Sequence, residues 1–150
     1  QKPNPVRIAI PAIRVSAPVI PLGLNPDGTL EVPKDYSETG WFTGGPEPGE
    51  RGAAVIAGHV DSKTGPAVFY RLRQLRRGDV IIVTLQDRSA ARYMVRSSMT
   101  VPKSRFPTKL VYRQTPYPAL RLITCDGAFD AATGHYRDNY IVFATLAEPR

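Results

Sequence analysis

Apolar and polar residues alternate with a period of two along several short stretches of the chain, which is typical of strands with one buried face. Val6–Ile10 alternates in this way, Val80–Leu85 is strongly β-branched, and Ala91–Val101 follows it as another strand. Ala53–Ala57 is apolar throughout, as expected of a fully buried strand. The pattern predicts about eight short strands, with the others at Ala17–Leu24, Thr29–Val32, Ala119–Cys125 and Tyr140–Leu146.

Proline and glycine separate these stretches. The 15 prolines and 12 glycines are too many for long helices, so short strands and many loops are expected. The turn sequence Asn25–Gly28 predicts a hairpin between the strands on either side of it. The segment Asp35–Glu50 is expected to be a loop, in which Trp41 and Phe42 fill the core.

Three further segments are predicted to be helical turns or loops. Apolar residues recur at helical spacing between Pro66 and Leu75, so a short helix is predicted there. Pro102–Pro118 holds four prolines and cannot be a central strand, so it is expected as a long ordered loop or a helical turn over one face. Ala128–Tyr136 is expected to be a loop. Together, these elements fit a closed β-barrel better than a sandwich.

Length and composition favour one globular domain. A chain of 150 residues with 42% apolar content can bury one hydrophobic core but not two comfortable ones. We expect residues 1–5 to be the remnant of a linker and residues 6–150 to form the domain. No stretch approaches the roughly 18–20 apolar residues of a membrane span. Because the chain starts at Gln1, we expect a trimmed or mature form, which is compatible with a membrane-anchored parent.

The net charge of +7 suggests an anionic neighbourhood, such as nucleic acid, an anionic membrane face or an acidic cell-wall polymer. The arginines cluster only at Arg71, Arg73, Arg76 and Arg77, and no recognition-helix, RNA-binding sheet or zinc-finger pattern accompanies them. A solvated basic face is the simpler interpretation of that cluster, so binding to nucleic acid is disfavoured.

Cys125 is the only cysteine, and it ends an apolar run. A lone thiol cannot form an intramolecular disulfide and makes a poor metal site, so it is either a packed apolar residue or a nucleophile. A free thiol with a pKa of about 8.5 is mostly protonated at neutral pH, so a nucleophile would need a nearby base or positive charge. His59 ends a buried strand and is a better candidate for that base than His135, which lies in a glycine-flanked loop.

Arg137 lies where the next predicted strand begins. Antiparallel neighbours bring the end of one strand beside the start of the next, so Arg137 is expected close to the sulfur of Cys125. Its permanently charged guanidinium could hold a substrate carbonyl or stabilise an oxyanion. Each residue alone has an ordinary interpretation, as a packed thiol, a surface histidine or a solvated arginine. Their common position at strand ends favours an active site.

These residues resemble those of the sortases, the cysteine transpeptidases of the Gram-positive cell surface, over nearly the whole chain. The family motif Thr-Leu-X-Thr-Cys is matched by Leu122–Cys125, with Arg121 in place of the first threonine. The family histidine follows a small apolar run, as in Ala54–His59, and the family arginine opens the strand after the cysteine loop, as Arg137 does.

The sequence around the histidine indicates the subgroup. Gly58–Ser62, followed by Gly65–Phe69 and Leu75–Asp79, is most similar to the actinobacterial class F sortases, with class E close behind.

The resemblance implies an all-β fold, an eight-stranded barrel with one or two short helices and long loops. It implies that Cys125 attacks the Thr–Gly carbonyl of a Leu-Pro-X-Thr-Gly-like sorting signal, and that an amine of a peptidoglycan precursor then resolves the thioester. His59 would protonate the leaving amine and deprotonate the incoming one, while Arg137 positions the substrate and steadies the oxyanion. Thr124 would contribute to the substrate pocket, and Pro102–Pro118 would wall the groove.

The resemblance further implies a monomer on the extracellular face of the membrane, N-terminally anchored in the full-length parent. Some sortases bind calcium through carboxylates, but no such acidic cluster is evident here, so neither a metal nor a cofactor is expected. Asp61 either orients the imidazole of His59 or caps a turn. Two alternatives stay open: a cysteine peptidase that hydrolyses the same motif, and a non-catalytic β-barrel binding module in which Cys125 is only packed.

Overall fold

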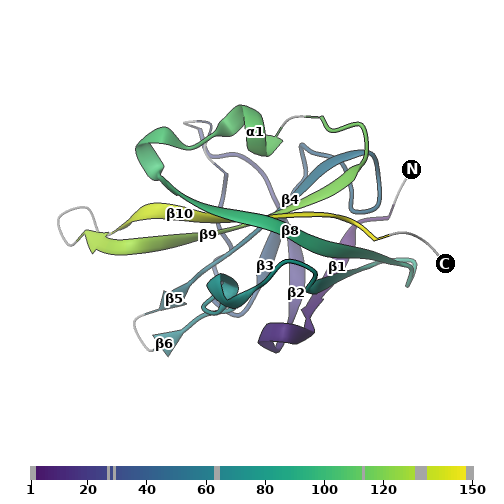
Figure 1. The fold of residues 1–150 in the computed structure, drawn as a ribbon, viewed down its shortest axis with the longest axis horizontal. Coiled ribbons are helices and arrows are strands. Elements are labelled where there is room, and N and C mark those ends of the chain that lie inside the picture. Colours follow the sequence, from purple (N-terminus) through teal and green to yellow (C-terminus); the bar gives the residue numbers. More distant parts are fainter. Residues whose placement is uncertain are drawn as a thin grey trace.

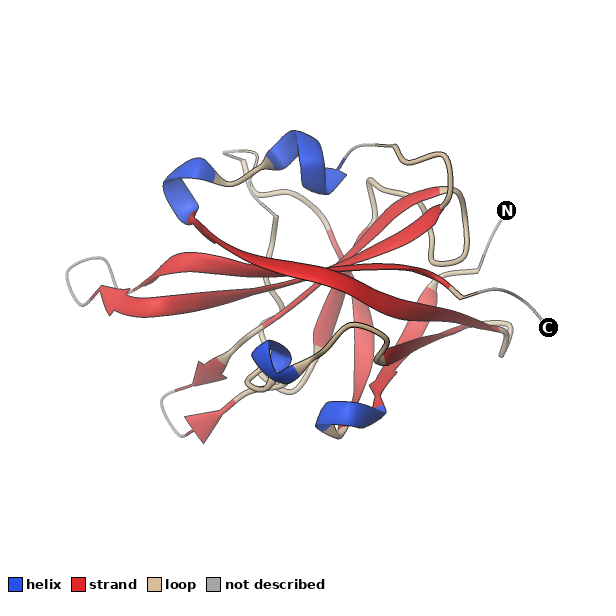
Figure 2. Cartoon of the chain, in the orientation of Figure 1, coloured by secondary structure: helices blue, strands red, loops and turns tan. Residues whose placement is uncertain are grey.

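The computed structural model describes residues 3–26, 28, 30–62, 65–112, 114–130 and 135–147, without the side chains of residues 62, 125–130 and 135–137. Strands dominate this part of the chain (Figures 1 and 2). The elements run in the order β1 (Pro5–Ile10), η1 (Pro11–Ile13), β2 (Val15–Leu22), β3 (Thr39–Phe42), β4 (Gly52–Gly58), β5 (Asp61–Ser62), β6 (Gly65–Pro66), η2 (Leu72–Gln74), β7 (Val80–Leu85), β8 (Ala90–Pro102), η3 (Lys103–Arg105), α1 (Thr108–Tyr112), β9 (Pro118–Asp130) and β10 (His135–Leu146), where η marks a 3-10 helix.

Eight strands close into a barrel in the order β1-β2-β3-β4-β9-β10-β8-β7, so the predicted eight-stranded all-β architecture is confirmed. The pairs β2–β3 and β4–β9 are parallel, and the other neighbours in the barrel are antiparallel. β5 and β6 form a separate small hairpin. In Figure 1 this hairpin lies on the same side of the barrel as the far end of the long β9–β10 pair.

The barrel buries side chains on two faces. The interior holds the larger cluster, in which Ile8, Ile56 and Leu122 are fully buried. A second cluster lies outside the barrel wall, where Val111 of α1 packs with residues of β4, β8, β9 and β10 (Figure 1). Its buried members are Val55, Val101, Val111, Ile123 and Ile141. Because β4 contributes to both clusters, every one of its residues is buried, which explains its uninterrupted apolar sequence.

The predicted loop Asp35–Glu50 contains a barrel strand, β3, so that prediction is wrong over four residues. β3 is short and includes Gly40, and its pairing with β2 and β4 rather than its own pattern makes it a strand. A Cβ atom on Gly40 would lie 2.2 Å from the side chain of Leu22, so that side chain occupies the space which a larger residue at position 40 would need. Trp41 fills the core as predicted, with 4% of its surface exposed, and its indole nitrogen donates to the Pro46 carbonyl at 3.1 Å.

The helix predicted from Pro66 to Leu75 is reduced to η2, and Pro66 instead pairs with Asp61 between β6 and β5. The apolar residues at helical spacing do enter the core, since Phe69 and Leu72 are fully buried. Irregular backbone rather than a regular helix brings them there. The predicted hairpin after β2 amounts to a single bridge between Leu24 and Leu30 among the described residues.

The strands β9 and β10 are longer than predicted. Asp130 pairs with His135, so the expected loop Ala128–Tyr136 is largely a continued antiparallel ladder. By contrast, the prediction for Pro102–Pro118 is confirmed, since η3 and α1 lie there as helical turns over one face of the sheet (Figure 2).

One prediction concerns Tyr93, which is fully buried and accepts a hydrogen bond from the Gly49 backbone N–H at 2.8 Å. Tyr93→Phe removes the acceptor and leaves that N–H without its partner. We expect the free energy of unfolding to fall by about 1–2 kcal/mol in urea denaturation. Tyr117→Phe is the matched control, because Tyr117 is 45% exposed, and an equal loss in both variants would contradict the argument.

The same tyrosine predicts a pH dependence. Burial raises the pKa of the Tyr93 phenol to about 12, above its ordinary value of 10.0, although the hydrogen bond from Gly49 acts in the opposite direction. Between these two values the unfolded chain has lost the phenolic proton and the folded chain keeps it, so stability falls as pH rises. We expect the wild type to lose about 1–3 kcal/mol more than Tyr93→Phe over this interval in urea denaturation. Parallel curves for the two proteins would contradict this.

Candidate functional site

The parallel pair β4–β9 brings two predicted site residues to the same edge of the barrel at the level of the backbone. The last aligned pair in this ladder is Ala57 with Ile123. His59 follows two residues after the first, and Cys125 two residues after the second. On the other side of β9, Asn139 of β10 pairs with Cys125.

Arg137 lies two residues before Asn139, at a shift in the β9–β10 register between the pairs Tyr136–Phe129 and Asp138–Asp126. The backbone of Arg137 is therefore in the same hairpin as that of Cys125. The side chains of both residues lie outside the described part of the chain, as does that of His135, so their predicted roles stay predictions. The backbone of His135 is in β10 rather than in the expected loop.

The side chain of His59 is described, and it is partly buried. Its Nε2 atom lies 2.6 Å from the carbonyl oxygen of Pro33, and its ring centroid lies 4.4 Å from that of Tyr36, with the planes tilted by 56°. The backbone carbonyl of His59 accepts a hydrogen bond from Phe69 N at 2.9 Å. Gly58 allows Phe69 to pack this close to the end of β4, because a Cβ atom on Gly58 would lie 2.8 Å from the Phe69 ring.

Sequence reasoning did not find Pro33 and Tyr36 as neighbours of His59. They lie 26 and 23 residues before it, and no local pattern signals the contact. Of the two roles considered for Asp61, neither is decided by its backbone position, which is in β5 opposite Pro66.

Thr124, directly before Cys125, is 4% exposed, and its Oγ1 atom has no hydrogen-bond partner among the described residues. Its partner in the ladder, Tyr140, is also buried, and the Tyr140 hydroxyl donates to Ser98 at 2.8 Å. A buried hydroxyl without a partner costs free energy, and such groups are rare in folded proteins.

Arg121, which replaces a threonine of the family motif, is also buried, with 5% of its surface exposed. Its guanidinium carbon lies 4.7 Å from the centre of the Phe143 ring, its neighbour across the β9–β10 ladder. An arginine over an aromatic face is favourable, and more so when water is excluded. The substitution is therefore accommodated by packing within the sheet.

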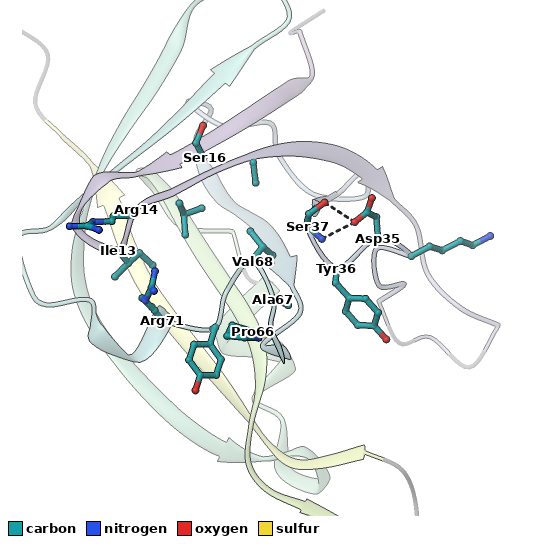
Figure 3. A pocket seen from close by; sticks show the side chains of 14 residues that line it. Ile13, Arg14, Ser16, Asp35, Tyr36, Ser37, Pro66, Ala67, Val68 and Arg71 are labelled. Atoms are coloured by element: carbon teal, nitrogen blue, oxygen red, sulfur yellow. Dashed lines mark hydrogen bonds between the residues drawn. The ribbon is translucent and has the colours of Figure 1, made fainter. Parts of the chain in front are cut away.

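The predicted solvated basic face is confirmed, since Arg71, Arg73, Arg76 and Arg77 are all exposed. Arg73 lies 4.8 Å from the centre of the Tyr140 ring and donates to Thr100 Oγ1 at 3.2 Å, so it packs on the barrel. Arg71 lines a cleft of about 920 Å³ between the η1–β2 turn, residues 34–37 and the segment after β6 (Figure 3). Tyr36 lies in the wall of this cleft, so its neighbour His59 is close by.

Among the residues that the structure describes, no group of three or more histidine, cysteine, aspartate or glutamate side chains is arranged to hold a metal ion.

Comparison with models of protein families shows the family of this chain. The model of the sortase domain matches residues 8–147, which is nearly the entire chain. The chain belongs to the sortase family. No curated protein sequence is similar enough to count as a relative.

Solved sortase structures share the fold of this sortase at low sequence identity. A lid mutant of sortase A from Corynebacterium diphtheriae has a TM-score of 0.75 at 23% identity, covering 100% of this chain and 73% of that one. Sortase C-1 from Actinomyces oris has a TM-score of 0.72 at 24% identity, covering 96% and 72%. Sortase C from Streptococcus pneumoniae has a TM-score of 0.74 at 21% identity, covering 97% and 68%.

Membership of this family makes the chain a sortase-type cell-wall sorting enzyme of the cell surface. Within the described residues of this sortase, no helix has the length and apolar character needed to cross a membrane.

A prediction follows for Thr124. Thr124→Val replaces the unpartnered hydroxyl with a methyl group of similar size, so we expect the free energy of unfolding to rise by about 1 kcal/mol. Thr39→Val is the matched control, since Thr39 is also fully buried but its hydroxyl donates to the Pro18 carbonyl at 2.9 Å. That variant should lose about 1 kcal/mol. Losses of equal size in both, measured by urea denaturation, would show that the Thr124 hydroxyl is stabilising.

Proposed function

We propose that this sortase is a cysteine transpeptidase that cleaves a Leu-Pro-X-Thr-Gly-like sorting signal between threonine and glycine and joins the new carboxyl end to an amine of the cell wall. The observation that carries the proposal is the parallel pairing of β4 with β9. Its register ends two residues before His59 and two residues before Cys125. This register supports the proposal, because a base and a nucleophile at equivalent positions beyond the last pair of two adjacent strands would be near enough for thiol acyl transfer.

In the first half of the reaction, the Cys125 thiolate attacks the threonine carbonyl of the sorting signal. The tetrahedral intermediate collapses as the bond from carbon to the glycine nitrogen breaks. His59, as the imidazolium, gives its proton to that nitrogen, so the peptide leaves as a neutral amine and a thioester remains on the sulfur.

In the second half, an amine of a peptidoglycan precursor attacks the thioester carbonyl and loses a proton to His59. The carbon–sulfur bond breaks, which restores the thiolate and the imidazolium and leaves a new amide bond. No cofactor, oxidant or metal is needed for the balance of either step.

Arg137 is proposed to stabilise the negative oxygen of both tetrahedral intermediates and to hold the substrate. This role is supported by its position in the β9–β10 ladder, two residues from the partner of Cys125. A guanidinium offers several donors in a fixed plane and keeps its charge at any working pH, so it suits an oxyanion.

Thr124 is proposed to belong to the substrate pocket. The support is its buried hydroxyl, which has no hydrogen-bond partner among the described residues and is available for one from the substrate. The segment 102–118, with η3 and α1, is proposed to wall the groove for the sorting signal. Phe106 and Tyr112 of this segment pack on the second hydrophobic cluster, the one outside the barrel wall, which anchors the segment to the barrel.

The resemblance around His59 supports assignment to the actinobacterial class F group, with class E as the alternative. We further propose that the domain works as a monomer at the extracellular face of the membrane, tethered by an N-terminal segment of the full-length protein.

Intact-protein mass spectrometry tests the nucleophile. With a Leu-Pro-X-Thr-Gly peptide, we expect a mass increase equal to the acyl fragment, which hydroxylamine removes and Cys125→Ala abolishes. Because Cys125 is the sole cysteine, one equivalent of an alkylating agent should block the reaction completely. Undiminished turnover in Cys125→Ala, or a thiol that is inert to alkylating agents, would instead support the alternative in which Cys125 is only packed.

A glycine peptide in the same assay separates transfer from hydrolysis. We expect the acyl group to partition to the added amine in proportion to its concentration. Partitioning that ignores the amine would identify a peptidase.

Arg137→Ala should lower kcat/KM by about 100- to 1000-fold, and Arg137→Lys should recover only part of this loss because the planar fork is missing.

A further inference from the structure

The hydrogen bond between His59 and Pro33 determines which imidazole nitrogen can react. A backbone carbonyl oxygen can only accept a hydrogen bond, so Nε2, 2.6 Å away, carries a hydrogen and donates it. Neutral imidazole has one such hydrogen. The lone pair that accepts a proton is therefore on Nδ1, and the Nε2–H bond to Pro33 persists in both protonation states.

The Tyr36 ring restricts rotation of the imidazole. Its centroid lies 4.4 Å from that of His59 at a tilt of 56°, a close ring contact just below the usual separation of about 4.5–7 Å. A half-turn of the imidazole about its χ2 bond would exchange the nitrogens with ring carbons and break the bond to Pro33. With Tyr36 in contact, the histidine has less room for this motion. The side chain of Tyr36 is itself 47% exposed, so its contact with His59 contributes little to the core.

The turn that carries Tyr36 is fixed by hydrogen bonds between the residues on either side of it. The Asp35 carboxylate accepts hydrogen bonds from the Ser37 backbone N–H at 2.8 Å and the Ser37 hydroxyl at 2.7 Å. These bonds lower the pKa of Asp35 below its ordinary value. In Figure 3 they lie on one side of the turn, and the Tyr36 ring points to the other.

Two consecutive residues after β6, Val68 and Phe69, hold the backbones of Tyr36 and His59. Val68 N donates to the Tyr36 carbonyl at 3.1 Å, and Phe69 N donates to the His59 carbonyl at 2.9 Å. The backbones of Tyr36 and His59 are therefore hydrogen-bonded to consecutive residues of one segment. Their separation is set by that segment rather than by the side chains alone.

We propose that Tyr36, acting with the Pro33 carbonyl, is a positioning residue that keeps His59 in the Nε2–H form with Nδ1 directed to the reaction. This inference rests on the proposed function of His59 as the general acid and base. The proton on Nδ1 of the imidazolium passes to the leaving glycine nitrogen as the carbon–nitrogen bond breaks. The neutral Nε2–H imidazole then takes the proton of the incoming amine at Nδ1.

Nitrogen-15 NMR of the imidazole tests the tautomer without substrate. The chain has two histidines, so His135→Gln leaves His59 as the sole imidazole signal. In this background we expect the Nε2–H tautomer in the parent protein and in Tyr36→Phe. Tyr36→Ala should show a mixture of tautomers. Tyr70→Ala is the matched control, because Tyr70 is 52% exposed in the wall of the same cleft, and its spectrum should match the parent.

The transfer assay gives the second readout. Tyr36→Ala should lower kcat by about 10- to 100-fold with little change in KM for the sorting peptide, since a misplaced catalytic group costs rate rather than binding. Tyr36→Phe should recover the parent rate. Tyr36→Leu, which keeps an apolar side chain without the ring, gives the same comparison if Tyr36→Ala is too unstable to study.

Three outcomes would overturn the inference: an unchanged tautomer in Tyr36→Ala, an unchanged rate in that variant, or a loss that appears in KM alone, which would make Tyr36 a substrate contact. Failure of the proposed function looks different. In that case the parent protein forms no thioester on Cys125, whereas the imidazole spectra of the free protein still report whether Tyr36 fixes the tautomer.

Discussion

The parallel pairing of β4 with β9 is the constraint on which the rest of this structure depends. Parallel neighbours cannot be joined by a tight turn, so the chain between them must make a long crossover, and here that crossover carries β5 to β8, η3 and α1. Both strands leave the barrel at the same edge. The backbones of His59 and Cys125, 66 positions apart in the sequence, therefore lie at equivalent positions, each two residues beyond the last pair of this ladder, which no local interaction could achieve.

Burial on two faces follows from the same pair. β9 lies between β4 and β10, with the barrel interior on one side and the cluster under α1 on the other. A polar residue in such a strand must find a partner within the protein or lose free energy. Arg121 packs over Phe143, whereas the Thr124 hydroxyl has no partner among the described residues. An unsatisfied group beside the proposed nucleophile is the kind of local cost that functional sites retain.

The short strand β3 links the barrel to the proposed base. It pairs with β4 at Thr39 and Gly58, directly before His59, and Thr39 is further fixed by its bond to the Pro18 carbonyl. The segment that precedes β3 therefore lies beside the histidine, where Pro33 and Tyr36 contact the imidazole. An element with little sequence signal of its own thus sets the surroundings of His59, the proposed base.

The sequence by itself determined the strands whose two faces meet different surroundings, such as β7, because alternating burial leaves a periodic pattern. It also determined the cysteine motif and the helical turns in the proline-rich segment before β9. Only the tertiary structure decided that Thr39–Phe42 is a strand, that β9 stays paired with β10 beyond Cys125, and that the Pro33 carbonyl bonds to His59. The physical reason is that these features depend on partners far away along the chain. Pairing energy between such partners leaves no periodic trace in either segment.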